Sequence, residues 1–277
     1  MRIILVLLAM LLLGPSFARA DDQLHLFAAG SLTDAMTEML AASGIPAARV
    51  APPVFGPSGT LRERIEKGAP ADILASADMR QPRQLADERG HRPVVVFTRN
   101  RMCLLARKAL GVTPANMLDR MLDPQLRLVT STPHADPGGD YAWAVFARAE
   151  ALHPGARAAL EAKALTLVGG PTSKPLVAGR GQVAGVFLAN KGDLMLGYCS
   201  SAAAVLRDVP GLASVPLPPE LTVGPAYGMV VLTDHALAAR FAIFVMSEQG
   251  QAILARNGFV PVAVPDEVQQ LPQGDIR

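Results

Sequence analysis

Two serine residues lie where a hydroxyl group and the neighbouring backbone could bind an anion. Ser31 and Ser58 each follow a short apolar run that predicts a strand, and each precedes residues with helical spacing. The first N–H groups of a helix have no partner within it, and with the positive end of the helix dipole they attract anions. A glycine beside each serine lets a ligand approach the backbone closely. Two such turns facing one point would bind an oxyanion, although a serine at a helix start also serves as an ordinary cap.

The second half of the chain contains two comparable turns and a tyrosine. Residues 136–139 (Asp-Pro-Gly-Gly), which include Gly138, precede a predicted helix, and residues 179–182 (Gly-Arg-Gly-Gln) precede another. Arg180 is either a bidentate clamp for an oxyanion or a solvated loop charge. Tyr198 ends a predicted strand, a position from which its hydroxyl could point into a cleft.

Motifs of common enzymes are absent from the sequence. There is no G-x-S-x-G, H-E-x-x-H, P-loop or C-x-x-C pattern, and the five histidines lie far apart without metal-ligand spacing. We therefore expect no catalytic residue, no cofactor and no resident metal. The enzymatic alternative is an exported hydrolase with Ser58 as its nucleophile, but no histidine or acid is placed to activate that serine.

The elements that position these residues alternate between strands and helices, which is typical of an α/β fold. Strands are predicted at 24–29, 50–55, 72–76, 94–97, 102–106, 126–129, 166–168, 193–198 and 226–232. Helices are predicted at 31–43, 60–67, 141–151, 182–189, 237–246 and 248–256. Residues 210–225 hold five prolines and predict a crossing linker. We expect two lobes, each with a mostly parallel sheet flanked by helices. Lobe 1 would comprise residues 21–98 and 222–277, and lobe 2 residues 99–221.

The composition and the N-terminus indicate an exported protein. Half of the 277 residues are hydrophobic and the net charge is +2, which excludes intrinsic disorder. One tryptophan, three tyrosines and no basic stripe argue against a nucleic-acid partner. Residues 1–20 combine a positive start, an apolar run too short to span a bilayer and an Ala-Arg-Ala site, which predicts a signal peptide cut after Ala20 rather than a membrane anchor. Its removal takes away Arg2 and Arg19, so the mature chain has 24 basic and 24 acidic residues and no net charge.

The two cysteines, Cys103 and Cys199, suit an oxidising compartment. An even count makes a disulfide plausible there, and two buried free thiols are the alternative. The strand-like run before each cysteine favours the bridge.

Several motifs resemble those of periplasmic molybdate-binding proteins, the substrate-binding components of molybdate ABC importers. Residues 27–35 (Phe-Ala-Ala-Gly-Ser-Leu-Thr-Asp-Ala) and 55–61 (Phe-Gly-Pro-Ser-Gly-Thr-Leu) resemble two signature turns of that family. Residues 65–73, read with Ser-Ala-Asp at 76–78, match a third motif, and 137–142 and 192–202 are looser matches. The resemblance runs in unbroken order from about residue 24 to 260.

The resemblance implies a type II periplasmic binding protein fold, with two lobes that are joined by a hinge and close on a tetrahedral oxyanion. The ligand would be molybdate or tungstate, the partner an inner-membrane ABC permease, and the protein a periplasmic monomer. Ser31 and Ser58 would each give a hydroxyl and a backbone N–H, Gly138 a backbone N–H and Tyr198 its hydroxyl. The remaining backbone donor corresponds to Arg180 or Gln182.

Some residues depart from the family pattern and leave other functions open. Ser-Thr-Pro at 131–133 stands where Gly-Asp-Pro is usual, and Cys-Ser-Ser at 199–201 replaces the usual residues after the tyrosine. Asp136 and Asp140 lie near the expected site, where a carboxylate repels an anion unless it points away. The alternatives are a receptor that binds a different anion through Arg180, and a sensor that docks on a signalling receptor.

Overall fold

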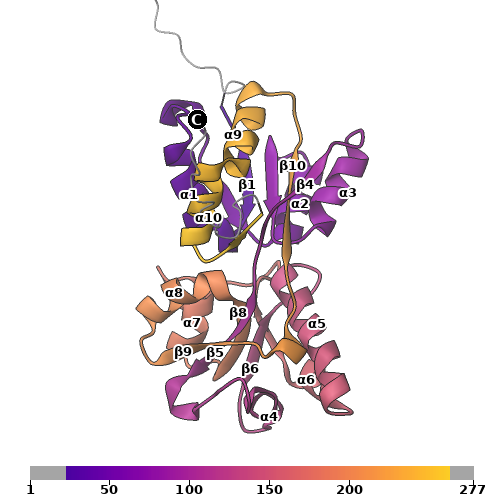
Figure 1. The fold of residues 1–277 in the computed structure, drawn as a ribbon, viewed down its shortest axis with the longest axis vertical. Coiled ribbons are helices and arrows are strands. Elements are labelled where there is room, and N and C mark those ends of the chain that lie inside the picture. The colour runs from indigo at the N-terminus through magenta and orange to yellow at the C-terminus, as the bar shows by residue number, and fades with distance from the viewer. Residues whose placement is uncertain (1–22, 263–277) are drawn as a thin grey trace, which may run out of the picture.

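Two β-sheets, one in each lobe, organise residues 23–262, the part of the chain that this computed structural model describes (Figure 1). The predicted signal peptide lies outside these residues. The first sheet has the order β11-β4-β10-β3-β1-β2. Its strands are β1 (Leu26–Ala29), β2 (Val54–Gly56), β3 (Ile73–Ser76), β4 (Val94–Arg99), β10 (Ala226–Val231) and β11 (Val260–Pro261). The second sheet has the order β7-β6-β8-β5-β9. Its strands are β5 (Met102–Arg107), β6 (Leu128–Ser131), β7 (Leu165–Val168), β8 (Leu194–Tyr198) and β9 (Leu212–Pro216).

The two-lobed α/β architecture agrees with the prediction, but both sheets are mixed rather than mostly parallel. β1 pairs in parallel with β2 and β3, and β6 pairs in parallel with β7 and β8. In contrast, β10 is antiparallel to β3 and β4, and β5 is antiparallel to β8 and β9. Parallel neighbours need a crossover helix between them. β5 and β10 enter their sheets from the other lobe, so that constraint does not apply to them.

Helices cover both faces of the first sheet because its central strands are apolar on both sides. These helices are α1 (Thr33–Ala42), α2 (Ser58–Glu66), α3 (Arg80–Glu88), α9 (Ala236–Met246) and α10 (Glu248–Arg256). Leu26 and Ala28 face α1, α9 and α10, whereas Phe27 faces α2 and α3. Strands buried on both faces are expected to read as continuous apolar runs, as β1 does. Because a shift of one residue would move every side chain to the other face, this alternation fixes the register of β1.

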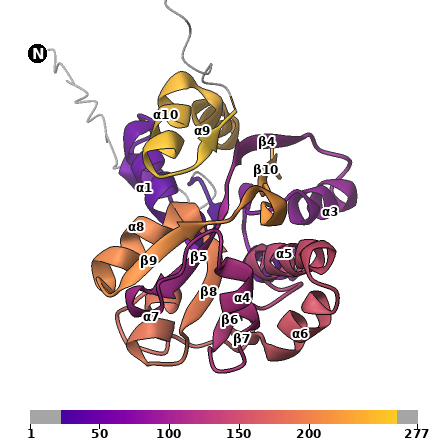
Figure 2. The same cartoon turned by 60° about the horizontal axis from the view of Figure 1, so that its bottom comes forward.

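The second sheet is covered in the same way, as Figure 2 shows. Its helices are α4 (Met117–Leu122), α5 (Pro137–Leu152), α6 (Ala156–Lys163), α7 (Gln182–Leu188) and α8 (Cys199–Asp208). Leu104 packs with α4, α5 and α6, and its neighbour Leu105 packs with α7 and α8. The predicted linker at 210–225 is in part wrong, because Leu212–Pro216 forms the edge strand β9 against β5. An edge strand tolerates the prolines that misled the prediction.

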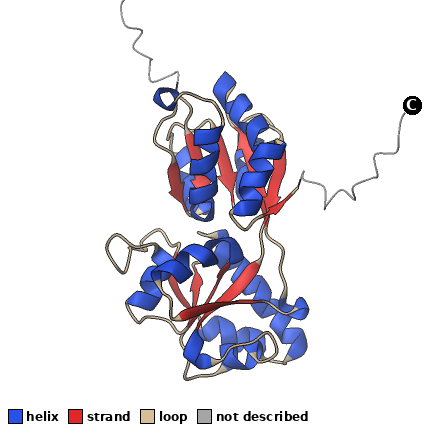
Figure 3. Cartoon of the chain, turned by 60° about the vertical axis from the view of Figure 1, so that its left-hand side comes forward, coloured by secondary structure: helices blue, strands red, loops and turns tan. Residues whose placement is uncertain are grey.

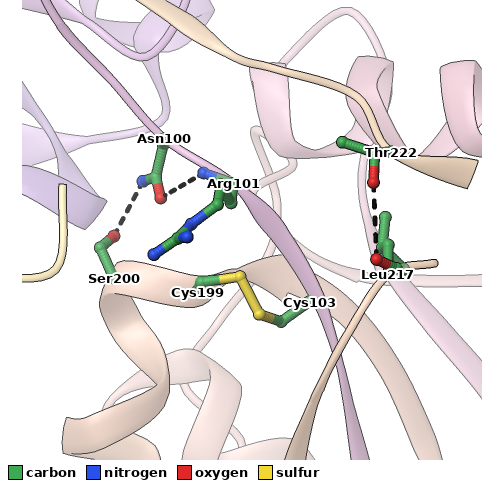
Figure 4. The surroundings of a disulfide bond; sticks show 7 residues. All are labelled: Asn100, Arg101, Cys103, Cys199, Ser200, Leu217 and Thr222. Carbon is green, nitrogen blue, oxygen red and sulfur yellow. Dashed lines mark hydrogen bonds between the residues drawn. A yellow bond between two sulfur atoms is a disulfide. The ribbon is translucent and has the colours of Figure 1, made fainter. Parts of the chain in front are cut away.

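The chain crosses between the lobes twice (Figure 3). The two crossings are hydrogen-bonded to each other. It leaves the first sheet after Arg99 and enters the second at Met102; it returns between Pro216 and Ala226. The Asn100 N–H donates to the Pro225 carbonyl at 2.8 Å. Beside this crossing, Cys103 on β5 forms a disulfide with Cys199 at the start of α8 (Figure 4). Within residues 23–262, no helix is long and apolar enough to cross a bilayer.

Candidate functional site

A cavity of about 750 Å³ lies between the two lobes and takes residues from both. Lobe 1 contributes the turn after β1 and the turn after β2, including Ser31 and Pro57. Lobe 2 contributes the starts of α5, α7 and α8, including Gly138, Gln182 and Tyr198. The cavity thus lies at the carboxyl ends of strands, where open α/β sheets bind their ligands.

Four of the six predicted site residues line this cavity: Ser31, Gly138, Gln182 and Tyr198. The other two, Ser58 and Arg180, are not among the described residues that line it. The turns that the sequence analysis selected thus border this cavity, while the side chains of Ser58 and Arg180 are directed elsewhere.

Ser31 lies in a short 3-10 turn, Gly30–Leu32, that directly continues β1. Its Oγ atom is 2.9 Å from the hydroxyl oxygen of Tyr227, a fully buried residue on β10. The amide of Asn100 donates to the same tyrosine oxygen at 3.0 Å. The hydrogen bond with Tyr227 therefore holds the Ser31 hydroxyl in place, and Ser31 lines the cavity.

Ser58 is the first residue of α2, but its side chain is turned into the protein. It is 0% exposed, and its Oγ accepts the backbone N–H of Ala77 at 3.1 Å. That bond joins the start of α2 to the residue after β3, and Pro57 lies on the cavity wall instead. The Ser58 hydroxyl thus serves the structure of the turn in this conformation.

The lobes touch beside this turn. Gly59 donates its backbone N–H to the Ala135 carbonyl of lobe 2 at 3.2 Å. A Cβ atom on Gly59 would lie 2.8 Å from that oxygen, so a glycine is required for the close approach. Nearby, Arg80 of lobe 1 forms an ion pair with Asp140 of lobe 2 at 2.7 Å. Asp140 therefore points away from the cavity wall toward its partner arginine.

Asp136 differs from Asp140, because it lines the cavity. It caps α5, and its Oδ1 accepts the Gly138 N–H at 3.2 Å. The Ser131 side chain also hydrogen-bonds to it. Burial raises the pKa of the Asp136 carboxyl group, and the negative charges of Asp140 and Asp78 raise it further. The Asp136 carboxyl group thus accepts the backbone N–H of Gly138, the donor that we expected to bind an anion.

Tyr198 ends β8 and lines the cavity, and its hydroxyl group is buried without a hydrogen-bond partner among the described residues. Its ring makes edge contacts with Tyr227 and Tyr141, at centroid distances of 5.7 Å and 6.4 Å. The Oη atom is buried and has no hydrogen-bond partner among residues 23–262. Burial also raises the pKa of Tyr198 well above its ordinary value, so the hydroxyl remains a neutral donor. Buried polar groups are nearly always paired, which makes this unpaired hydroxyl a candidate donor to a ligand.

The last two candidates, Arg180 and Gln182, behave differently. The Arg180 side chain is 51% exposed, and its guanidinium pairs with Asp208 at 2.9 Å. Gln182 begins α7, lines the cavity, and accepts the Gly169 N–H through Oε1 at 3.2 Å. Of these two residues, Gln182 is the one that lines the cavity.

Sequence reasoning missed three residues near the cavity: Asn100, Ser200 and Tyr227. Asn100 Nδ2 donates to Ser200 Oγ at 2.8 Å, and Ser200 lines the cavity (Figure 4). The available signal was the polar break between the strand runs before and after Asn100. Nothing in the spacing of Tyr227 indicated that its hydroxyl would reach Ser31.

Two lobes, two crossing segments and a cavity lined by hydrogen-bond donors define a ligand-capturing protein. The chain belongs to the family of bacterial extracellular solute-binding proteins, whose model matches residues 24–260. Members of this family bind solutes and are not enzymes, as the missing catalytic motifs led us to expect.

Comparison with individual proteins shows one relative in sequence and several similar folds. An uncharacterised protein of Pasteurella multocida (strain Pm70) is 36% identical over 208 residues, which cover 75% of this chain and 86% of that protein. The periplasmic molybdate-binding protein of Azotobacter vinelandii has a similar fold, with a TM-score of 0.66, 17% identity, and coverage of 87% of this chain and 100% of that one. The sulfate-binding protein SubI of Mycobacterium tuberculosis H37Rv gives a TM-score of 0.68 and 18% identity, with 87% of each chain covered. At these identities the two structures show the fold alone.

Proposed function

We propose that this protein captures a small oxyanion, with molybdate and tungstate as the leading candidates, and delivers it to an ABC permease of the inner membrane. The observation that carries the proposal is the buried, unpaired hydroxyl of Tyr198 on the cavity wall. The motifs shared with molybdate-binding proteins support the choice of ligand. The predicted signal peptide supports a periplasmic protein, and we expect it to be a monomer.

The binding chemistry in this proposal depends on neutral donors. The mature chain has no net charge, so oriented hydroxyl and N–H groups have to supply the attraction locally. Ser31 and Tyr198 provide hydroxyl groups from opposite lobes. Arg180, paired with Asp208, is not needed, which argues against the alternative receptor that uses it. Selectivity would follow from the fit, because a smaller anion leaves some of the donors unpaired.

The protonation state of Asp136 affects anion binding at the start of α5. As a carboxylate it would repel a dianion, whereas as a neutral acid it donates a hydrogen bond to one. Its raised pKa makes the neutral acid easier to reach than for an ordinary aspartate. Binding of a fully deprotonated oxyanion there is accordingly accompanied by uptake of a proton at Asp136.

A larger anion is the second candidate, because the cavity is larger than four oxygen atoms require. At about 750 Å³ it lies within the range of about 300–1,000 Å³ that is usual for drug-sized ligands. The cavity extends along α8 to Arg256 and Asn257. An organic phosphate or carboxylate could place its anionic group at Ser31 and Tyr198 and its remainder in this extension.

The hydrolase alternative receives no support from the structure. Ser58, its nucleophile, is 0% exposed and its oxygen accepts a backbone hydrogen bond. A substrate could not reach that oxygen without unfolding the turn.

Thermal unfolding with molybdate, tungstate, sulfate, phosphate and a sugar phosphate tests the proposal. Stabilisation by molybdate and tungstate supports the first candidate, because a ligand that binds the folded state raises the melting temperature. Stabilisation by the sugar phosphate alone would replace it with the second candidate. Uptake of labelled molybdate into vesicles that contain the cognate permease separates transport from sensing, since a sensor would not stimulate uptake.

A further inference from the structure

The side-chain amide of Asn100 lies at the crossing from β4 to β5, and the direction of its hydrogen bonds is fixed. Asn100 is 2% exposed, and its Oδ1 accepts the backbone N–H of Arg101 at 2.8 Å (Figure 4). A backbone N–H can only donate, so the atom that faces it has to be the amide oxygen. The Nδ2 atom therefore faces two hydroxyl groups, Tyr227 Oη at 3.0 Å and Ser200 Oγ at 2.8 Å.

The hydrogen bond from Asn100 to Tyr227 also determines which residue donates in the hydrogen bond between Tyr227 and Ser31. The Tyr227 oxygen accepts a hydrogen from Asn100, so the tyrosine's own hydrogen needs another acceptor. Among the described residues, Ser31 Oγ at 2.9 Å is the acceptor recorded for it. Because Tyr227 is fully buried, leaving that hydrogen unpaired would be costly. Tyr227 therefore donates to Ser31, and the Ser31 hydrogen remains available to an occupant of the cavity.

Asn100 orients the Ser200 hydroxyl directly, without an intervening residue. Ser200 lies on α8 in the opposite lobe, and its oxygen accepts from Asn100. Its hydrogen is then available to the cavity that it lines. One amide thus sets the direction of two hydroxyl groups that face the cavity from different lobes.

We propose that Asn100 is a positioning residue that makes Ser31, through Tyr227, and Ser200 into hydrogen-bond donors toward a bound oxyanion. Ser200 becomes a further ligand-binding residue in this arrangement. An oxyanion accepts hydrogen bonds only, so two hydroxyls held as donors match its chemistry. The inference rests on the proposed function, since it requires an oxyanion in this cavity.

A double-mutant cycle tests the branch through Tyr227. Molybdate affinity is measured by calorimetry for the wild type, Tyr227→Phe, Ser31→Ala and the double variant. We expect Tyr227→Phe to weaken binding about fivefold or more in the wild type and to have no further effect when Ser31 is already alanine, because Tyr227 acts through Ser31. Tyr141→Phe is the matched control, since it removes a hydroxyl that bonds to the backbone of Ala226 rather than to Ser31. An equal loss from Tyr227→Phe in both backgrounds would overturn this branch.

The second branch is tested by Ser200→Ala beside Ser201→Ala. Both serines line the cavity, but only Ser200 accepts from Asn100 among the described contacts. We expect a loss of about tenfold for Ser200→Ala, because a hydrogen bond to a charged ligand is removed, and a clearly smaller change for Ser201→Ala. Equal effects of the two variants would remove Ser200 from the binding site.

Asn100→Asp reverses the direction of the whole network. A carboxylate accepts from both hydroxyls, which would turn the hydrogens of Tyr227 and Ser200 away from the cavity. We expect a larger loss of affinity than for either single hydroxyl variant. If this variant fails to fold, the serine and tyrosine variants still test the roles of Tyr227 and Ser200. If the wild type binds no oxyanion, the proposed function fails; if it binds one and the cycle is additive, only the inference fails.

Discussion

The carboxyl group of Asp136 accepts the backbone N–H of Gly138 at 3.2 Å, so an acid of the protein itself occupies the start of α5. This carboxyl group lines the ligand cavity, and burial raises its pKa. A helix start that would otherwise attract an anion therefore already has a carboxyl group of the protein as its acceptor.

This relationship predicts that stability and affinity depend on pH. With its pKa raised in the folded protein, Asp136 holds its proton to higher pH than it does in the unfolded chain. The stability from this proton is fully present below the ordinary aspartate value of 3.8 and is lost as the pH rises through the raised value. Asp136→Asn should remove that loss and flatten the fall of molybdate affinity with rising pH. Parallel pH curves for the wild type and the variant, measured by thermal unfolding and calorimetry, would contradict this account.

Tyr198→Phe should weaken ligand binding without reducing stability. The Tyr198 hydroxyl is buried and unpaired among the described residues, so its removal costs the ligand-free protein nothing and relieves a desolvated group. In the complex it would remove a hydrogen bond to a charged ligand, worth about 1.5–3 kcal/mol. Calorimetry and denaturant unfolding measure the two effects separately. A loss of stability with unchanged affinity would show that the hydroxyl has a structural role instead.

Gly59→Ala should impair closure of the lobes. The new methyl group would lie 2.8 Å and 2.9 Å from the backbone carbonyl oxygens of Ala135 and His134, which cannot move aside as a flexible side chain would. We expect weaker ligand affinity, and a larger radius of gyration by small-angle scattering in the presence of ligand. Gly224→Ala is the matched control, since a Cβ atom there meets nothing within 4 Å. Identical behaviour of the two variants would exclude a role for this contact in closure.

The disulfide between Cys103 and Cys199 should contribute strongly to stability. It links residues 96 positions apart, and closing a loop of about 100 residues in the unfolded chain corresponds to about 4–5 kcal/mol. Replacing both cysteines with alanine should lower the free energy of unfolding by an amount of this order, measured in denaturant. Mass spectrometry of the non-reduced protein checks the bond itself, and two free thiols in it would contradict the structure.

Arg180→Ala should leave oxyanion affinity nearly unchanged. The arginine is half exposed and paired with Asp208, and exposed ion pairs are typically worth about 0–1 kcal/mol. A large loss of affinity in calorimetry would instead support a receptor that uses a charged clamp.

The sequence was sufficient to predict the turns that surround the cavity, because strand ends and helix starts leave local signals. Glycine next to Ser31 and Ser58, and Gly138 before a helical pattern, are such signals, and both turns of lobe 1 line the cavity together with turns of lobe 2. Side-chain direction was not predictable in the same way. Whether the Ser58 hydroxyl faces a ligand or the Ala77 N–H depends on how α2 packs against the end of β3, which is a tertiary contact.

Residues that act across long separations left still weaker signals. Ser31 and Tyr227 are 196 positions apart, and only the return of the chain through β10 brings their hydroxyls together. The edge strand β9 was missed for a related reason: its pairing with β5 outweighs the prolines around it. Local spacing thus predicted which turns line the cavity, whereas the crossings between the lobes determine which residues from distant segments meet there.

Calorimetric titration of molybdate into the wild type and into Tyr198→Phe is the sharpest test of oxyanion binding in this cavity. We expect saturable binding at one site per chain in the wild type and binding weakened about tenfold or more in the variant. Absence of binding to the wild type, or equal affinity for the two proteins, would contradict this expectation.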